Sequence, residues 1–148
     1  MGRNVKDCMP RISQLMEGVM MIAGTQRLID DMLISDYRKL PDACVPELFR
    51  DSDEPATESC PIEGEVRSLD SKRRQWAKEQ LSNLSDEFTL YSLGEDDYAR
   101  LAMAVREEAE KLPVQSEEPL THLPGMTELV SENIYKMFSL FDDCMKEG

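Results

Sequence analysis

Apolar side chains recur every three or four residues near the start of the chain, which is the spacing of one face of an α-helix. Alternating steps of four and three, with a period of about 3.5 residues, are typical of a coiled-coil or helix-bundle seam. The row predicts a helix over about residues 8–39, which ends there because Pro41 disfavours helical geometry at Leu40. Its members are Cys8, Ile12, Leu15, Val19, Ile22, Gln26, Ile29 and Leu33, of which seven are apolar.

Details of this first helix carry further expectations. Met16, Ala23 and Met32 widen the apolar stripe, which favours a bundle core over a two-stranded zipper. Asp7 is the expected N-terminal cap. A helical Gly is less favourable than Ala by roughly 1 kcal/mol, so we expect Gly18 and Gly24 to allow a close approach by another helix.

A second row with the same rhythm predicts a last helix over about residues 125–146. Because an apolar seam lies near each end of the chain, we expect the first and last helices to pair. Antiparallel and parallel packing differ in whether Cys8 and Cys144 meet. The row comprises Val130, Ile134, Met137, Phe141 and Cys144, broadened by Leu129, Phe138, Leu140 and Met145.

The middle of the chain predicts two further helices, over about residues 68–91 and 95–112. Ser92 and Glu95 have the spacing of a capping box at the start of the third helix, and Pro113 ends it. Between the first two helices, residues 41–64 form an acidic connector rich in Pro, which we expect to be mobile. The predicted fold is an all-α bundle of about four helices in one domain, 1–148, with coiled-coil-like first and last helices.

Charge is distributed unevenly along the chain. The net charge is −13, and residues 1–50 contain equal numbers of acidic and basic side chains, so residues 51–148 supply all of it. Such a field repels nucleic-acid phosphates and anionic lipid, so we expect neither direct nucleic-acid binding nor a membrane partner. It favours solubility, and it also motivates an alternative function as an acidic decoy that occupies a basic groove of another protein.

Residues that carry catalysis or bind metals are scarce. His122 is the only histidine, and a general base needs partners within hydrogen-bond reach that the sequence does not indicate. Cysteine lacks the closely spaced pairs of a zinc site, and no glycine-rich phosphate loop is present. We therefore expect a protein that is not an enzyme and has no cofactor. The basic run Lys72–Arg74, beside Trp76, is interpreted as a solvated helix face.

The sequence also bears on cellular location and on phosphorylation. No apolar run reaches the roughly 18 residues of a membrane-spanning helix, and the N-terminal stretch does not have the form of a secretory signal. We expect an intracellular protein whose four cysteines are thiols. Three serines, Ser52, Ser85 and Ser92, precede acidic residues and are candidate phosphorylation sites.

The two seams predict the function. We expect a small helical subunit or adaptor that binds other proteins, with helices as partners, in a homo- or hetero-oligomer. Burial of apolar side chains drives such association. The alternative is that the two seams close on each other as an ordinary core. The predicted partner-binding residues are Leu15, Val19, Ile22, Ile29, Ile134, Phe138 and Phe141.

Overall fold

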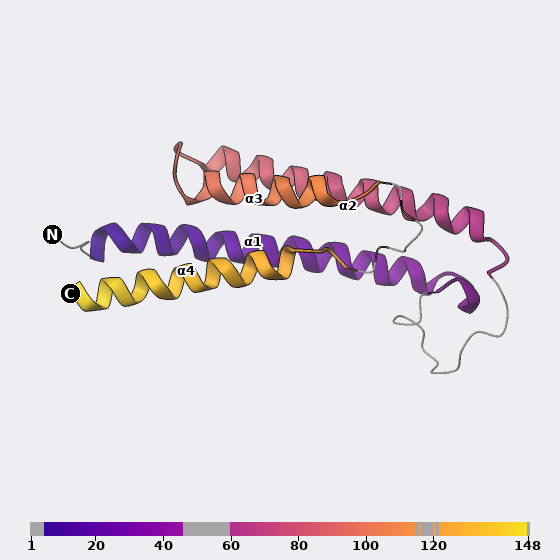
Figure 1. Cartoon of the computed structure of the whole chain (residues 1–148), viewed down its shortest axis with the longest axis horizontal. Coiled ribbons are helices and arrows are strands. Elements are labelled where there is room, and N and C mark those ends of the chain that lie inside the picture. The colour runs from indigo at the N-terminus through magenta and orange to yellow at the C-terminus, as the bar shows by residue number, and fades with distance from the viewer. Residues whose placement is uncertain (1–4, 46–59, 115, 117–119, 121, 148) are drawn as a thin grey trace.

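The computed structural model describes residues 5–45, 60–114, 116, 120 and 122–147. Within these ranges the chain is an all-α helical bundle, as predicted, with four α-helices that run alternately in opposite directions (Figure 1). In Figure 1, α1 and α4 lie side by side, α2 and α3 form a second pair above them, and the two chain ends lie at the same end of the bundle. The elements are α1 (Val5–Arg38), the 3₁₀ turn η1 (Asp42–Cys44), α2 (Glu63–Tyr91), α3 (Asp97–Lys111) and α4 (Met126–Glu147).

The largest boundary error is at the start of α2, which begins at Glu63 rather than near residue 68. Pro61 and Gly64 resemble connector residues in the sequence, but Glu63 and Glu65 favour a helix start because acidic side chains interact well with the N-terminal end of the helix dipole. Residue 7 lies within α1, so the predicted cap at Asp7 is wrong. Most of the predicted connector, residues 46–59, lies outside the described residues.

The core is a continuous apolar cluster to which all four helices contribute. Gly18 of α1 lies close to α3, because a Cβ atom there would collide with Leu101 and reach 3.7 Å from the ring of Phe88. The close approach expected at Gly18 is therefore confirmed. Gly24 has no neighbour within 4 Å of such an atom, so the same expectation is wrong there.

The first and last helices pack against each other in antiparallel orientation. Cys8 is joined to Cys144, with Cα atoms 6.2 Å apart, and further along the pair Gln26 donates a hydrogen bond of 3.2 Å to Thr127. Cys44, which ends η1, is joined to Cys60 with a Cα separation of 4.8 Å. The expectation of four free thiols is wrong, because all four cysteines are in disulfides.

The buried row of α4 differs from the predicted one. Val130, Ile134 and Phe141 were expected to face the core together with Met137 and Cys144, but the residues most buried are Met126, Leu129, Asn133, Leu140 and Cys144. Two adjacent apolar rows run along this helix, and the positions of α1 and α3 determine which of them is buried. Periodicity alone does not distinguish the two.

A buried polar network joins the C-terminal end of α1 to α2. The hydroxyl of Tyr37 lies 2.9 Å from Oδ1 of Asp70 and 3.2 Å from the carbonyl oxygen of Leu120. Arg73 donates to the same Asp70 oxygen at 3.0 Å, lies 3.6 Å from the carboxylate of Asp36, and stacks 4.4 Å from the centre of the Tyr37 ring. Burial, followed by the Asp70 carboxylate, raises the pKa of Tyr37 above its ordinary value, so this hydroxyl stays protonated.

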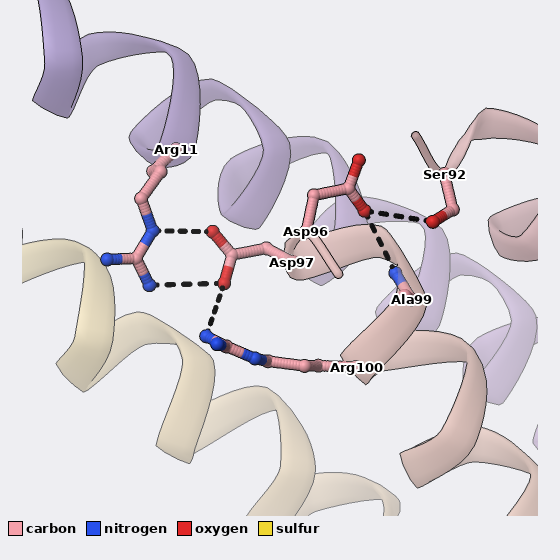
Figure 2. Close-up of polar contacts among 6 residues, drawn as sticks. All are labelled: Arg11, Ser92, Asp96, Asp97, Ala99 and Arg100. Atoms are coloured by element: carbon pink, nitrogen blue, oxygen red, sulfur yellow. Dashed lines mark hydrogen bonds and ion pairs between the residues drawn. The ribbon is translucent and has the colours of Figure 1, made fainter. Parts of the chain in front are cut away.

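Asp96, rather than Ser92, caps α3, so the predicted capping box is wrong. Figure 2 shows its carboxylate accepting hydrogen bonds from the Ala99 backbone and from the hydroxyl of Ser92, which is itself the C-terminal cap of α2. Although burial opposes the shift, hydrogen bonds from the Leu93 and Ala99 backbones and from Ser92 hold the pKa of Asp96 below its ordinary value.

The neighbouring carboxylate ties α3 to α1. Asp97 is buried and receives two hydrogen bonds from the Arg11 guanidinium, at 2.9 and 3.2 Å, while Arg100 lies 3.5 Å away (Figure 2). The hydrogen bond to Asp97 raises the pKa of Arg11. This bidentate ion pair fixes the start of α3 against the first turns of α1.

Candidate interaction surface

The structure separates the predicted partner-binding residues into two groups. Leu15, Ile22 and Ile29 are at most 1% exposed, because they form part of the core of this chain. Val19 and Ile134 are half-buried. The sequence left open whether the two seams pack on each other or on a partner. In the structure α1 and α4 pack on each other, so a partner has access to other side chains of these two helices.

Phe138 and Phe141 are on the surface of α4. They are 65% and 51% exposed, and Met145, one turn further on, is 67% exposed. Steps of three and four residues place these three side chains on one side of the helix. We call Phe138, Phe141 and Met145 the phenylalanine row.

A matching row of exposed methionines lies on α1. Met9 and Met16 are each 48% exposed and Met20 is 69% exposed. Spacings of seven and four residues place them on one line along the helix. We call Met9, Met16 and Met20 the methionine row. Met16 was expected to widen the core stripe, so that expectation is wrong.

The two rows lie on the same side of the α1–α4 pair. On α1, Gly18 points to α3 and Cys8 points to α4. Because each residue advances about 100° around a helix, the methionine row lies opposite Gly18, beyond the side that meets α4. On α4, the phenylalanine row lies on the other side of Cys144 from Leu129, which points into the core. The helical geometry therefore places both rows on the side of the α1–α4 pair that faces away from α3, and together we call them the outer face.

The α1 side of the outer face carries little charge. Between and beyond the methionines, the positions on the same line of α1 are Ser13, Gly24 and Arg27. The nearest carboxylate on α1, that of Glu17, accepts a hydrogen bond from Tyr98 of α3. That bond, with burial, raises the pKa of Tyr98 to about 12. On the α1 side a partner therefore meets methionine side chains, whereas on α4 the exposed Asp142 lies one turn from Phe138.

Other candidate sites from the sequence have different outcomes. Arg73 and Arg74 are buried, and Arg74 donates to the carbonyl oxygen of Ser116, so only Lys72 of the basic run is the solvated residue that was expected. Ser85 is 1% exposed and donates to the carbonyl oxygen of Ala102 at 2.8 Å, so the folded chain does not present its hydroxyl to a kinase. Ser52 lies outside the described residues.

Ser92 also lies in a different context from the expected one. It follows the last turn of α2, and its hydroxyl contacts the carboxylate of Asp96. A phosphate there would meet both a helix C-terminus and an anion, so it would not stabilise α3 in the way that the sequence suggested. Among the described residues, no group of three or more His, Cys, Asp or Glu side chains is placed to hold a metal ion. No described helix is long and apolar enough to span a bilayer.

No protein-family model, curated protein or solved structure matches the chain. The outer face is therefore interpreted from its own geometry. Sequence reasoning identified Phe138 and Phe141 but missed the methionine row. The available signal was the spacing of Met9, Met16 and Met20, which form an apolar line outside the heptad row of α1.

Proposed function

We propose that the chain is a non-enzymatic binding module that docks a helical partner protein on its outer face. The observation that supports this proposal is the gathering of six large apolar side chains, each at least 48% exposed, on one side of the α1–α4 pair. Large contiguous apolar patches on a protein surface mark interaction sites. Methionine suits such a surface because its flexible, polarisable side chain adapts to a partner.

The energy available from the outer face sets the strength of binding. Full burial of a Met or Phe side chain is worth about 1.5–3 kcal/mol, so completing the burial of these half-exposed residues releases about 1 kcal/mol each. Association loses several kcal/mol of translational and rotational freedom. The six side chains alone therefore support weak, reversible binding. Tighter binding requires that the partner also reach the half-buried Ile12, Val19 and Ile134.

Capture from the native source tests the proposal. The double variant Phe138→Glu/Phe141→Glu places two carboxylates at the centre of the outer face without removing a core contact. We expect the natural chain to retain a defined partner on an affinity column and the double variant to lose it. Leu93→Glu is the matched control, because Leu93 is 93% exposed in the turn between α2 and α3, and this variant should retain the partner.

Salt separates this proposal from the acidic decoy. Burial of apolar surface changes little with added salt, whereas binding through a net charge of −13 weakens steeply because salt screens exposed charges. Retention that disappears at high salt but is unaffected by Phe138→Glu/Phe141→Glu would favour the decoy. If Phe138→Glu/Phe141→Glu and Leu93→Glu both retained the partner at high salt, the partner would bind a surface other than the outer face.

The intracellular location stays a prediction from the sequence, and the disulfides count against it. Cys8–Cys144 and Cys44–Cys60 favour an oxidising compartment, because reducing systems keep cytosolic cysteines as thiols. Thiol counting on the protein denatured directly from its native source decides the question. We expect no free thiol from an oxidising compartment, and four free thiols would restore the intracellular prediction.

A further inference from the structure

A groove lies at the opposite end of α1 from the chain termini, between α1 and α2. It has a volume of about 440 Å³, within the range of small-molecule sites. Its apolar lining consists of the buried Leu33, the partly exposed Met32 and Leu69, and Leu40 and Trp76. The groove shares no residue with the outer face.

Two lysines line the same groove. Lys39 follows the C-terminus of α1 and Lys72 lies on α2, and both side chains are exposed. Neither forms an ion pair with any described residue. Arg73 also lines the groove, but its guanidinium is already held by Asp70 and Asp36. Among the described residues that line the groove, Lys39 and Lys72 are therefore the cations available to a ligand, in a chain whose net charge is −13.

The lining also limits the charge of the ligand. Asp36 lines the groove 3.6 Å from Arg73, and its carboxylate would repel a doubly charged head group more than a singly charged one. Apolar walls from Met32, Leu69 and Trp76 fit an alkyl chain. We propose that the groove binds a fatty acid, with the alkyl chain against these walls and the carboxylate at Lys39 and Lys72.

Trp76 provides a direct measurement, because it is the only tryptophan of the chain and it lines the groove. Bromine quenches indole fluorescence on contact, so bromoundecanoate serves as the probe with the full chain, below the concentration at which it forms micelles. We expect saturable quenching that excess decanoate reverses. Decanol, which has the alkyl chain without the charge, should compete about tenfold less well, and decylammonium should compete less well still.

Variants locate the two parts of the site. Lys39→Gln/Lys72→Gln should weaken probe binding about tenfold, while Lys136→Gln, an exposed lysine on α4, should leave it unchanged. Leu69→Glu should weaken binding at least as much, because it places a carboxylate beside the alkyl chain. Equal helicity by circular dichroism shows that each variant is folded.

Three results would overturn the proposal: quenching that does not saturate, equal competition by decanol and decanoate, or equal affinity in Lys39→Gln/Lys72→Gln. None of these bears on the outer face. Partner capture by the Lys39→Gln/Lys72→Gln variant should equal that of the natural chain, so the two proposals fail independently.

Discussion

The two helix pairs of this bundle are held together in different ways. α2 and α3 are neighbours in the sequence, joined by a short turn that Asp96 and Ser92 organise, and Ser85 bonds across to the backbone of Ala102. α1 and α4 come from opposite ends of the chain and are held by apolar packing and the Cys8–Cys144 bond. The α2–α3 pair is thus specified by its turn, whereas the α1–α4 pair depends on its disulfide and on which apolar row of α4 packs against the core. The other apolar row of α4 remains on the surface.

Removal of the disulfides tests this comparison with the largest effect. Cys8 and Cys144 are 136 residues apart and Cys44 and Cys60 are 16 apart. Because the longer closed loop constrains the unfolded chain more, Cys8→Ala/Cys144→Ala should lower the free energy of unfolding by about 4–5 kcal/mol and Cys44→Ala/Cys60→Ala by about 3 kcal/mol. Urea denaturation without reductant measures both. If Cys8→Ala/Cys144→Ala lost no more free energy of unfolding than Cys44→Ala/Cys60→Ala, the α1–α4 pair would not depend on the Cys8–Cys144 bond.

The polar network between the two pairs should give the next largest effect. Asp70→Ala removes the acceptor shared by Tyr37 and Arg73 and leaves Arg73 with only Asp36, so we expect a loss of about 3 kcal/mol. Tyr37→Phe keeps the Arg73–Asp70 pair and should lose about 1 kcal/mol. Thermal unfolding measures both variants. Asp86→Ala, at an exposed position of α2, is the control, and a similar loss there would remove the claim that burial of the network matters.

The two glycines of α1 sharpen the comparison further. Gly24→Ala adds a methyl group in open space and should raise the free energy of unfolding by about 0.5–1 kcal/mol through helix propensity. Gly18→Ala forces Leu101 to move within the core, at a cost of about 1–3 kcal/mol that exceeds this gain. The two substitutions should therefore differ in sign in the same denaturation assay. Stabilisation by both would mean that α1 and α3 are less closely packed at Gly18.

The smallest effects concern pH. The pKa of Asp96 is lowered in the folded chain, so its ionised carboxylate contributes stability that is present above the ordinary value of 3.8 and is lost as the pH falls through the folded pKa. Asp96→Asn retains a capping side chain and should flatten the acid limb of the stability profile. An unchanged acid limb in Asp96→Asn would contradict the role of this carboxylate.

Asp30 on α1 should behave in the opposite way. Burial raises its pKa, and its Oδ1 atom is buried without a hydrogen-bond partner among the described residues. The ionised form is therefore penalised once the pH exceeds the ordinary Asp value. Asp30→Asn should be slightly more stable than the natural chain at neutral pH, with the difference closing in acid. Denaturation at several pH values measures this, and a constant difference would contradict it.

The sequence predicted the elements of the fold better than their faces. The heptad row of α1 predicted the seam that contains Leu15, Ile22 and Ile29, because only one line of that helix is continuously apolar over its length, but it left open whether this seam packs inside the chain or on a partner. α4 offers two apolar rows, and the positions of α1 and α3 determine that Leu129 and Leu140 are buried while Phe138 remains exposed.

The polar contacts were harder to foresee. Arg73 and Arg74 form part of a basic run, and long charged side chains are usually solvated. Their burial depends on Asp36, Asp70 and the backbone of Ser116, which come from three separate segments. The cysteine pairing depended in the same way on tertiary structure, since antiparallel packing of α1 and α4 is what brings Cys8 to Cys144.

Methionine oxidation tests the outer face most directly. Met20 on the outer face and Met103 on α3 are similarly exposed, at 69% and 65%, while Met126 is fully buried. Mild peroxide treatment followed by mass spectrometry should oxidise Met20 and Met103 of the isolated chain and spare Met126. In the native extract, where the partner is present, we predict that Met20 is protected and Met103 is still oxidised. Equal oxidation of Met20 in both samples would contradict the docking of a partner on this face.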